Sequence, residues 1–501
     1  MALALAWAVL CAAGCGWAAV RNVHIKSNRC VDTWSPETIV ATVCNRLGMS
    51  DQERCIALWE FVARSMFHHA TPADHGFGDR WPNYTLDGMK LLNVYGFSLC
   101  TPMSVTLGML FEAAGYEAEI IKLPGHSIVH VKYDNSWHAF DPMMAWYVLK
   151  PDGSVAGCQD IAEKPSLILN AQAEGRASNP FCPCGDKPEW LAKAIASWSS
   201  FGPGSVNKPR WKPDYVLRQG EELCLLWDNE GKFWSPRTPK GSLPVHSCSI
   251  NRDRAWPAFE KYWAPYVKTI AGRQVVRYWT TSRLTYEPNL RTPSFREGVT
   301  RSENLAQSGP GQPGPALHPA QAGEPASVTF RVASQYVFAD ATLRVGVVRK
   351  GEADLLAVSV SVDGGRTWRS LGQAPVGERE ITQSLTSFVA GYYQYLLRFE
   401  LRAASDPLAC GIDKLKLEHL VMANAKVFPQ LFPGENRITI EVANPEELAN
   451  QRVEVEFAWF EGETLKTLRK TLRESPTEFT ITVWGETTPK MRHIRIACRP
   501  K

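Results

Sequence analysis

Residues 91–142 read LLNVYGFSLCTPMSVTLGMLFEAAGYEAEIIKLPGHSIVHVKYDNSWHAFDP and contain one helical pattern followed by three strand patterns. Apolar residues recur at helical spacing over 101–114, and Gly115 ends that pattern. The segments that alternate as strands do are 118–123, 127–133 and 137–140. The Asp-Asn-Ser at 134–136 signals a turn between the last two. A helix followed by an antiparallel meander predicts an α+β domain.

Cys100 stands where a loop ends and the predicted helix begins. A helix N-terminus carries partial positive charge and backbone N–H groups that have no partner within the helix. Both features lower the pKa of a thiol, and the N–H groups can also stabilise an oxyanion. A cysteine at this position is therefore suited to acyl transfer.

His126 and Asp141 are the candidate partners of this thiol. His126 opens one predicted strand and Asp141 closes the next, so an antiparallel hairpin places both at the same end. A carboxylate there can accept a hydrogen bond from one imidazole nitrogen and leave the other facing the thiol. His130 lies on the same strand face and is an alternative base, although the Gly-His context favours His126. Otherwise we expect His130 to be partly exposed and His138 to face solvent.

These elements resemble the transglutaminase-like superfamily, in which a cysteine begins a helix, a Gly-His opens a strand and an Asp-Pro closes the next. The matching segments are Gly96–Cys100, Leu110–Gly115, Gly125–Val131 and Trp137–Pro142. The resemblance covers roughly residues 50–145. It implies a papain-like fold and a thioester acyl-enzyme, with Cys100 as nucleophile, His126 as base and Asp141 as the residue that orients the base.

No motif assigns a side-chain oxyanion donor. Tyr95, Asn93 and Trp81 lie upstream of the thiol, and the backbone N–H of Cys100 is the preferred donor. Farther upstream, residues 35–67 are expected to be helical, because Ser50 and Glu53 form a capping-box signature ahead of an apolar helical face.

The first nineteen residues are uncharged and apolar, which is typical of an export signal. Simple cleavage is favoured over lipidation at the Ala-Ala-Gly-Cys of residues 12–15 and over an uncleaved anchor. An exported chain is periplasmic, cell-surface or secreted, and it contacts a membrane only through this signal or a lipid anchor.

Cysteine usage agrees with an oxidising compartment. Ten cysteines remain outside the leader once Cys100 is set aside: Cys30, Cys44, Cys55, Cys158, Cys182, Cys184, Cys224, Cys248, Cys410 and Cys498. We expect many of them to form disulfides, in preference to a zinc site built on the Cys-Pro-Cys at 182–184.

The 501 residues are too many for one core. After the signal 1–19 we predict a transglutaminase-like α+β domain at 20–200, a β-rich extension at 201–305 and a Pro/Gly-rich linker at 306–327. Two all-β sandwiches follow, at 328–417 and 418–501. The first sandwich contains Ser361-Val-Asp-Gly-Gly-Arg-Thr-Trp368, which resembles the Asp-box turn of sialidases. We expect Asp363 to bind turn N–H groups and Trp368 to pack beneath, in a structural role.

We expect no nucleic-acid partner, because 55 basic and 51 acidic residues leave a net charge of only +4, which is too weak over this length to argue for one. The leading hypothesis is an exported cysteine enzyme that acts on amide bonds of a protein, peptide or peptidoglycan-like substrate, as a peptidase, transamidase or amidase. The alternative is a non-catalytic surface scaffold with a transglutaminase-like domain. Carbohydrate contact through the β domains is a further candidate, and no cofactor or metal is expected.

Overall fold

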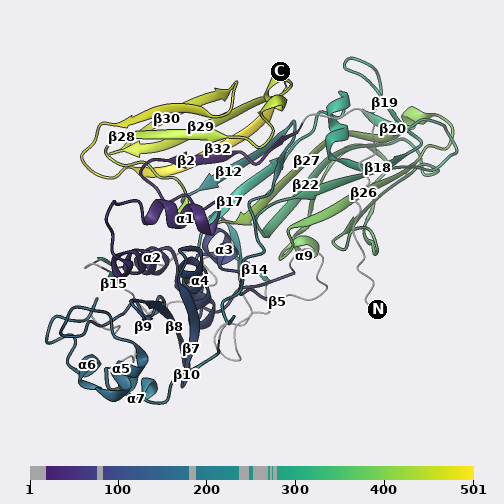
Figure 1. Ribbon diagram of the computed structural model, residues 1–501. Helices are drawn as coiled ribbons and strands as arrows, with labels where there is room; N and C mark the ends of the chain where they lie inside the picture. The colour runs from purple at the N-terminus through teal and green to yellow at the C-terminus, as the bar shows by residue number, and fades with distance from the viewer. Residues whose placement is uncertain are drawn as a thin grey trace, which may run out of the picture.

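The computed structural model describes residues 19–75, 83–179, 188–202, 204–228, 230–235, 248–251, 269–270, 273–274 and 279–500. Within these ranges the chain is multidomain and mostly β, with several sheets (Figure 1). Residues 1–18, which hold nearly all of the expected signal, lie outside the described ranges. Among the described helices, none combines the length and the apolar character that crossing a lipid bilayer requires.

Helices gather in the N-terminal part of the chain (Figure 1). They are α1 (Pro36–Val43), α2 (Asp51–Ser65), α3 (Gly88–Lys90), α4 (Cys100–Ala113), α5 (Cys158–Glu163), α6 (Ser166–Leu169) and α7 (Pro188–Ile195). The segment predicted as helical over 35–67 is two helices, since α1 ends before Cys44 and α2 starts after Ser50. The predicted capping box is confirmed, because Ser50 Oγ accepts from Glu53 N while Glu53 Oε2 accepts from Ser50 N.

A four-stranded antiparallel sheet packs on α4. Its order is β10 (Ser199–Ser200), β7 (Glu117–Leu123), β8 (His126–Tyr133) and β9 (Ser136–Phe140). The predicted turn is present, with Asp134 and Asn135 at φ of 51° and 59°, a left-handed conformation that these residue types tolerate. Helix and hairpin therefore match the sequence prediction to within a residue or two.

Short elements lead into α4. The chain passes from α3 through one π-helical turn, Leu91–Tyr95, to Gly96 and then to β6 (Phe97–Ser98), which pairs in parallel with β3 (Phe67–His68). Gly96 has φ of +68°, and a Cβ placed there would lie 2.5 Å from the side chain of Asn424. Asn424 also donates to the carbonyls of Ser65 and Leu92, so the C-terminal half of the chain supports this approach to α4.

One long sheet runs through most of the β part. Its path is β19 (Leu305–Gln307), β20 (Leu317–Pro319), β27 (Cys410–Met422), β17 (Thr281–Tyr286), β12 (Glu221–Leu226), β32 (Lys490–Arg499), β29 (Arg452–Glu461) and β30 (Thr464–Leu472). Beside β27 lies β22 (Phe338–Arg349), which pairs in turn with β25 (Gly377–Ser384). Two smaller sheets accompany it.

One of the smaller sheets has five strands, in the order β18 (Val299–Glu303), β21 (Ala326–Ala333), β26 (Gln394–Arg402), β23 (Leu355–Ser361) and β24 (Arg369–Gln373). The other has three strands, in the order β2 (His24–Ser27), β28 (Gly434–Glu441) and β31 (Thr477–Val483). In the described ranges, the strands not yet named are β1 (Val20–Arg21), β4 (Ala73–Asp74), β5 (Asn83–Tyr84), β11 (Val216–Leu217), β13 (Lys232–Ser235), β14 (Cys248–Asn251), β15 (Thr269–Ile270) and β16 (Arg273–Gln274), and the last α-helix is α9 (Thr386–Val389).

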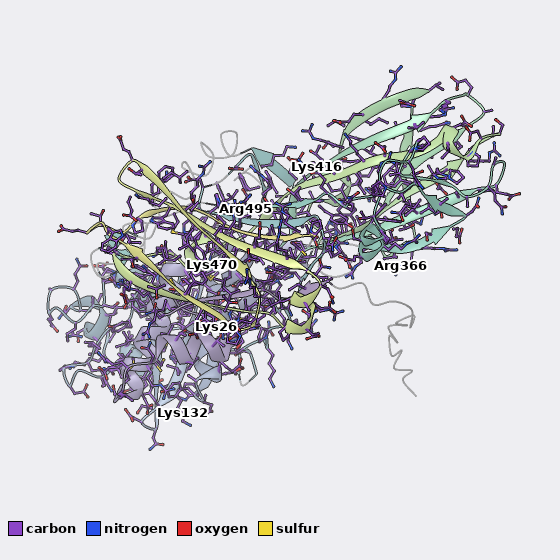
Figure 2. All side chains as sticks on the ribbon, turned by 90° about the horizontal axis from the view of Figure 1, so that it is seen from above. Lys26, Lys132, Arg366, Lys416, Lys470 and Arg495 are labelled. Carbon is purple, nitrogen blue, oxygen red and sulfur yellow. The ribbon has the colours of Figure 1, made fainter. Side chains whose placement is uncertain are left out.

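These pairings cross the domain borders drawn from the sequence. The border at 417/418 falls inside β27, and the extension contributes β12 and β17 to the sheet that holds β27 and β32. Lys26 lies beside the C-terminal strands in Figure 2, because β2 pairs with β28. The Pro/Gly-rich segment 306–327 contains β20 and buries Leu317 completely, so it is part of a sheet edge as well as a connection.

A buried ionic cluster joins the helical part to the β part. Lys90 Nζ lies 3.2 Å from Asp74 Oδ1, and Asp74 is 2% exposed. The hydroxyls of Tyr95 and Tyr393 donate to Asp74 Oδ2 at 2.7 and 3.0 Å. Because Tyr393 belongs to the β part, the carboxylate connects segments more than 300 residues apart in sequence.

Candidate active site

Cys100 is the first residue of α4. The preceding Leu99 is extended, with φ of −82° and ψ of −178°, so the helix and its free N–H groups begin at the cysteine. Two hydrogen bonds fix this end of α4 to the start of β8: Thr101 Oγ1 donates to Ser127 Oγ at 2.9 Å, and Ser104 Oγ donates to the Ser127 carbonyl at 3.1 Å. The thiol is partly exposed, as a nucleophile must be.

His126 and Asp141 meet as the hairpin predicts. His126 Nε2 and Asp141 Oδ2 are 2.6 Å apart, and the residues are 5% and 0% exposed. The other carboxylate oxygen, Oδ1, accepts from the backbone N–H groups of Met143 and Met144, both at 2.8 Å. Trp59 Nε1 donates to the Asp141 carbonyl at 2.8 Å. The carboxylate is thus held in one orientation, and Nδ1 of the imidazole is left for the thiol.

The thiol and the imidazole interact directly and shift each other's proton affinity. Burial raises the pKa of Cys100, but the hydrogen bond and the charge of His126 outweigh burial and bring that pKa below its ordinary 9.0. Burial lowers the pKa of His126, but the Asp141 carboxylate outweighs it and raises that pKa to about 10. Both shifts favour a thiolate beside an imidazolium at neutral pH.

Trp190 of α7 lies against the imidazole, with its ring centroid 6.2 Å from that of His126. It covers one side of the histidine and is itself only partly buried. No local sequence pattern marked this residue or Ser127, because both reach the site through packing between elements. Trp59 lies on the buried face of α2, and its hydrogen bond to the Asp141 carbonyl gives it a second role beside core packing.

The two other histidines of the hairpin are buried, which corrects their predicted exposure. His130 is 2% exposed in its side chain, where its Nδ1 lies 3.5 Å from Glu119 Oε1 and its Nε2 accepts from Cys158 N at 3.1 Å. His138 was expected to face solvent but is 3% exposed, with Nδ1 2.6 Å from the Val155 carbonyl. Segments that follow the hairpin in sequence cover both rings.

The upstream oxyanion candidates have other contacts. Tyr95 donates to Asp74, and Asn93 Nδ2 donates to the carbonyls of Thr33 and Met89. Trp81 lies outside the described residues. The backbone N–H of Cys100 remains the preferred donor because the helix begins at that residue.

The Asp-box-like turn has the predicted form. Asp363 Oδ1 accepts from Thr367 N at 2.9 Å, and Oδ2 accepts from Thr367 Oγ1 at 2.6 Å. Gly364 and Gly365 have φ of 74° and 89°. Trp368 stacks on the guanidinium of Arg398, whose Cζ is 4.1 Å from the ring centroid.

Among the cysteines whose side chains the structure describes, eight are free thiols: Cys30, Cys44, Cys55, Cys100, Cys158, Cys224, Cys410 and Cys498. The disulfide prediction therefore finds no support at seven of its ten positions, while Cys182, Cys184 and the side chain of Cys248 lie outside what the structure describes. Within the described ranges, no group of three or more His, Cys, Asp or Glu is arranged to hold a metal ion.

No protein-family description and no curated protein matches this sequence. Among solved structures, a β-glucuronidase of Faecalibacterium prausnitzii is 11% identical over 42% of this chain and 41% of its own, with a TM-score of 0.17. The Ruminococcus gnavus β-glucuronidase is 10% identical over 44% and 40%, with a TM-score of 0.17. A putative β-galactosidase from Bacteroides fragilis is 9% identical over 54% and 36%, with a TM-score of 0.15. The chain spans roughly two fifths of these proteins, and similarity at this level carries no argument about function.

Proposed function

We propose that this chain is a cysteine-dependent enzyme of the transglutaminase-like kind that acts on amide bonds through a thioester on Cys100. The observation that carries the proposal is the Cys100–His126–Asp141 arrangement at the N-terminus of α4. It combines a thiol of lowered pKa, an imidazole of raised pKa and a carboxylate 2.6 Å from that imidazole.

The chemistry follows from these positions. The Cys100 thiolate attacks the amide carbonyl carbon, and the oxyanion that forms lies near the first N–H groups of α4. The His126 imidazolium gives its proton to the departing amine as the C–N bond breaks, which leaves a thioester and a neutral imidazole. The neutral imidazole then takes a proton from water, or from an acceptor amine, as that nucleophile attacks the thioester and releases Cys100.

Asp141 has a positioning role in this scheme. Its second oxygen is engaged by the N–H groups of Met143 and Met144, so the carboxylate cannot rotate away when the imidazolium forms. Its charge stabilises the imidazolium, which in turn stabilises the thiolate.

The test is the pH dependence of thiol alkylation by iodoacetamide, followed by peptide mapping of the wild type and His126→Ala. Cys44 serves as an internal control, because it is also partly exposed but burial raises its pKa. We expect Cys100 to react faster than Cys44 below pH 8 in the wild type, and the difference to vanish in the variant.

Equal profiles for Cys100 and Cys44 in the wild type would refute an activated thiolate. That result would favour the non-catalytic scaffold, and a screen of binding partners would then replace the screen of amide substrates.

A further inference from the structure

A groove lies on the outer face of the five-stranded sheet β18–β21–β26–β23–β24, on strands that contribute nothing to the Cys100 site. Its volume is about 810 Å³. That size is within the range of about 300–1,000 Å³ that small-ligand sites occupy. Successive side chains of a strand point to opposite faces of the sheet. Those of β21 and β26 that point inward form the sandwich core, and those that point outward line the groove.

The register places polar side chains in rows across the groove. Thr329 pairs with Arg301 on one side and with Arg398 on the other. The neighbouring row holds Glu303, Ser327 and Glu400 in the same order. The groove is therefore lined by guanidinium, carboxylate and hydroxyl groups that project from adjacent strands at fixed spacings.

Two of the guanidinium groups are held in place by neighbours within the sheet. Arg398 stacks on Trp368 at 4.1 Å from the ring centroid and donates to Ser359 Oγ at 3.4 Å. Arg331 donates twice to Gln394 Oε1, at 3.2 and 2.9 Å. A guanidinium that is already oriented loses less rotamer freedom when it binds an anion.

The charged side chains that line the groove indicate which class of ligand it binds. Four arginines line the groove, Arg301, Arg331, Arg398 and Arg402. Its two carboxylates each pair with one of them, Glu303 with Arg301 and Glu400 with Arg398, so two positive charges remain in excess. The excess of arginine favours ligand carboxylates, which guanidinium groups bind in a bidentate manner. The two glutamates repel a chain of closely spaced anions but accept hydrogen bonds from hydroxyl groups.

We propose that this groove binds an acidic oligosaccharide, a chain of sugar residues that carry both carboxylates and hydroxyls. The sugar carboxylates bind Arg398 and Arg331, and the hydroxyls bind the carboxylates, Gln394 and the hydroxyl side chains of the groove. An acidic peptide supplies carboxylates but few hydroxyl donors, so it places further negative charge beside Glu303 and Glu400, which already pair with Arg301 and Arg398, without offering hydroxyls to their remaining lone pairs. This inference does not depend on the chemistry of Cys100.

The experiment is isothermal titration of the full-length protein with hexasaccharides of galacturonate, of mannuronate and of hyaluronan. A neutral galactose oligosaccharide and oligoglutamate of equal length are the comparison ligands. The variants are Arg398→Gln and Arg331→Gln. Arg379→Gln is the matched control, because Arg379 is an exposed arginine on β25 of the other sheet.

We expect at least one of the acidic sugars to bind, the neutral sugar and oligoglutamate to bind at least about tenfold more weakly, and each groove variant to lose about tenfold in affinity. Arg379→Gln should bind as the wild type does, and unchanged circular dichroism should confirm that all variants fold. The proposal is overturned if none of the three acidic sugars binds, if oligoglutamate binds as tightly, or if Arg379→Gln loses as much affinity as Arg398→Gln.

Discussion

Replacing Asp141 by Asn is the most informative single change at the candidate site. The Asn side-chain oxygen can still accept from Met143 N and Met144 N, so the turn after β9 is retained. The negative charge beside His126 is lost. Because burial lowers the pKa of His126 and the carboxylate is the main group that opposes burial, that pKa should fall from about 10.

The loss of positive charge on His126 also changes the pKa of Cys100. A neutral imidazole no longer supplies the positive charge that offsets burial, so the pKa of Cys100 should rise, while the backbone hydrogen bond at Ser127 still opposes burial. Below the pKa, the thiolate fraction changes tenfold for each unit. The rate of Cys100 alkylation at pH 7 should therefore fall by about 10- to 100-fold.

The assay is the rate of iodoacetamide labelling of Cys100 between pH 5 and pH 10, read by mass spectrometry of the Cys100 peptide. Asp134→Asn is the matched control, because it removes a carboxylate from the exposed turn of the same hairpin. Its left-handed φ of 51° suits Asn equally well. An unchanged labelling profile in Asp141→Asn, with folding intact, would show that the carboxylate does not set the state of the thiol.

Three other predictions follow from the same contacts. His130→Leu should leave Cys100 labelling unchanged but lower the free energy of unfolding in urea by about 1–3 kcal/mol, because the N–H of Cys158 loses its acceptor; a loss of labelling would make His130 the base. Asp74→Ala should cost about 3–5 kcal/mol in the same measurement, because Lys90 is left as a buried, uncompensated charge, and a cost below 1 kcal/mol would contradict the ionic cluster. The imidazole of His126, followed by nitrogen NMR, should keep its proton through neutral pH and lose it near pH 10, so a transition near pH 6.5 would contradict the ion pair.

Local periodicity was enough to predict the elements that carry the candidate site. The apolar pattern of 101–114 and the alternation around 134–136 depend on neighbours in sequence, and α4, β8 and β9 begin and end close to the predicted residues. The meeting of His126 with Asp141 followed as well, because a tight hairpin leaves only one arrangement for its two ends. The catalytic role of these residues stays a prediction.

Exposure and sheet membership could not be predicted in the same way, because they depend on segments distant in sequence. His138 is covered by the segment that contains Val155, whose carbonyl forms a hydrogen bond with the His138 ring. Helix α7 places Trp190 against His126. In the β part, alternation identified strands but not their partners, so the border at 417/418 was drawn through β27.

The sequence by itself determined where the helix and hairpin of the site lie and which three side chains they present, since both depend on short-range geometry. Only the tertiary structure decided that β12, β17, β27 and β32 share one sheet, that Asn424 supports the turn at Gly96, and that Asp74 joins the two halves. The physical reason is that backbone hydrogen bonds and buried charges are satisfied by whichever segments the whole chain brings together, and side-chain periodicity does not specify those partners.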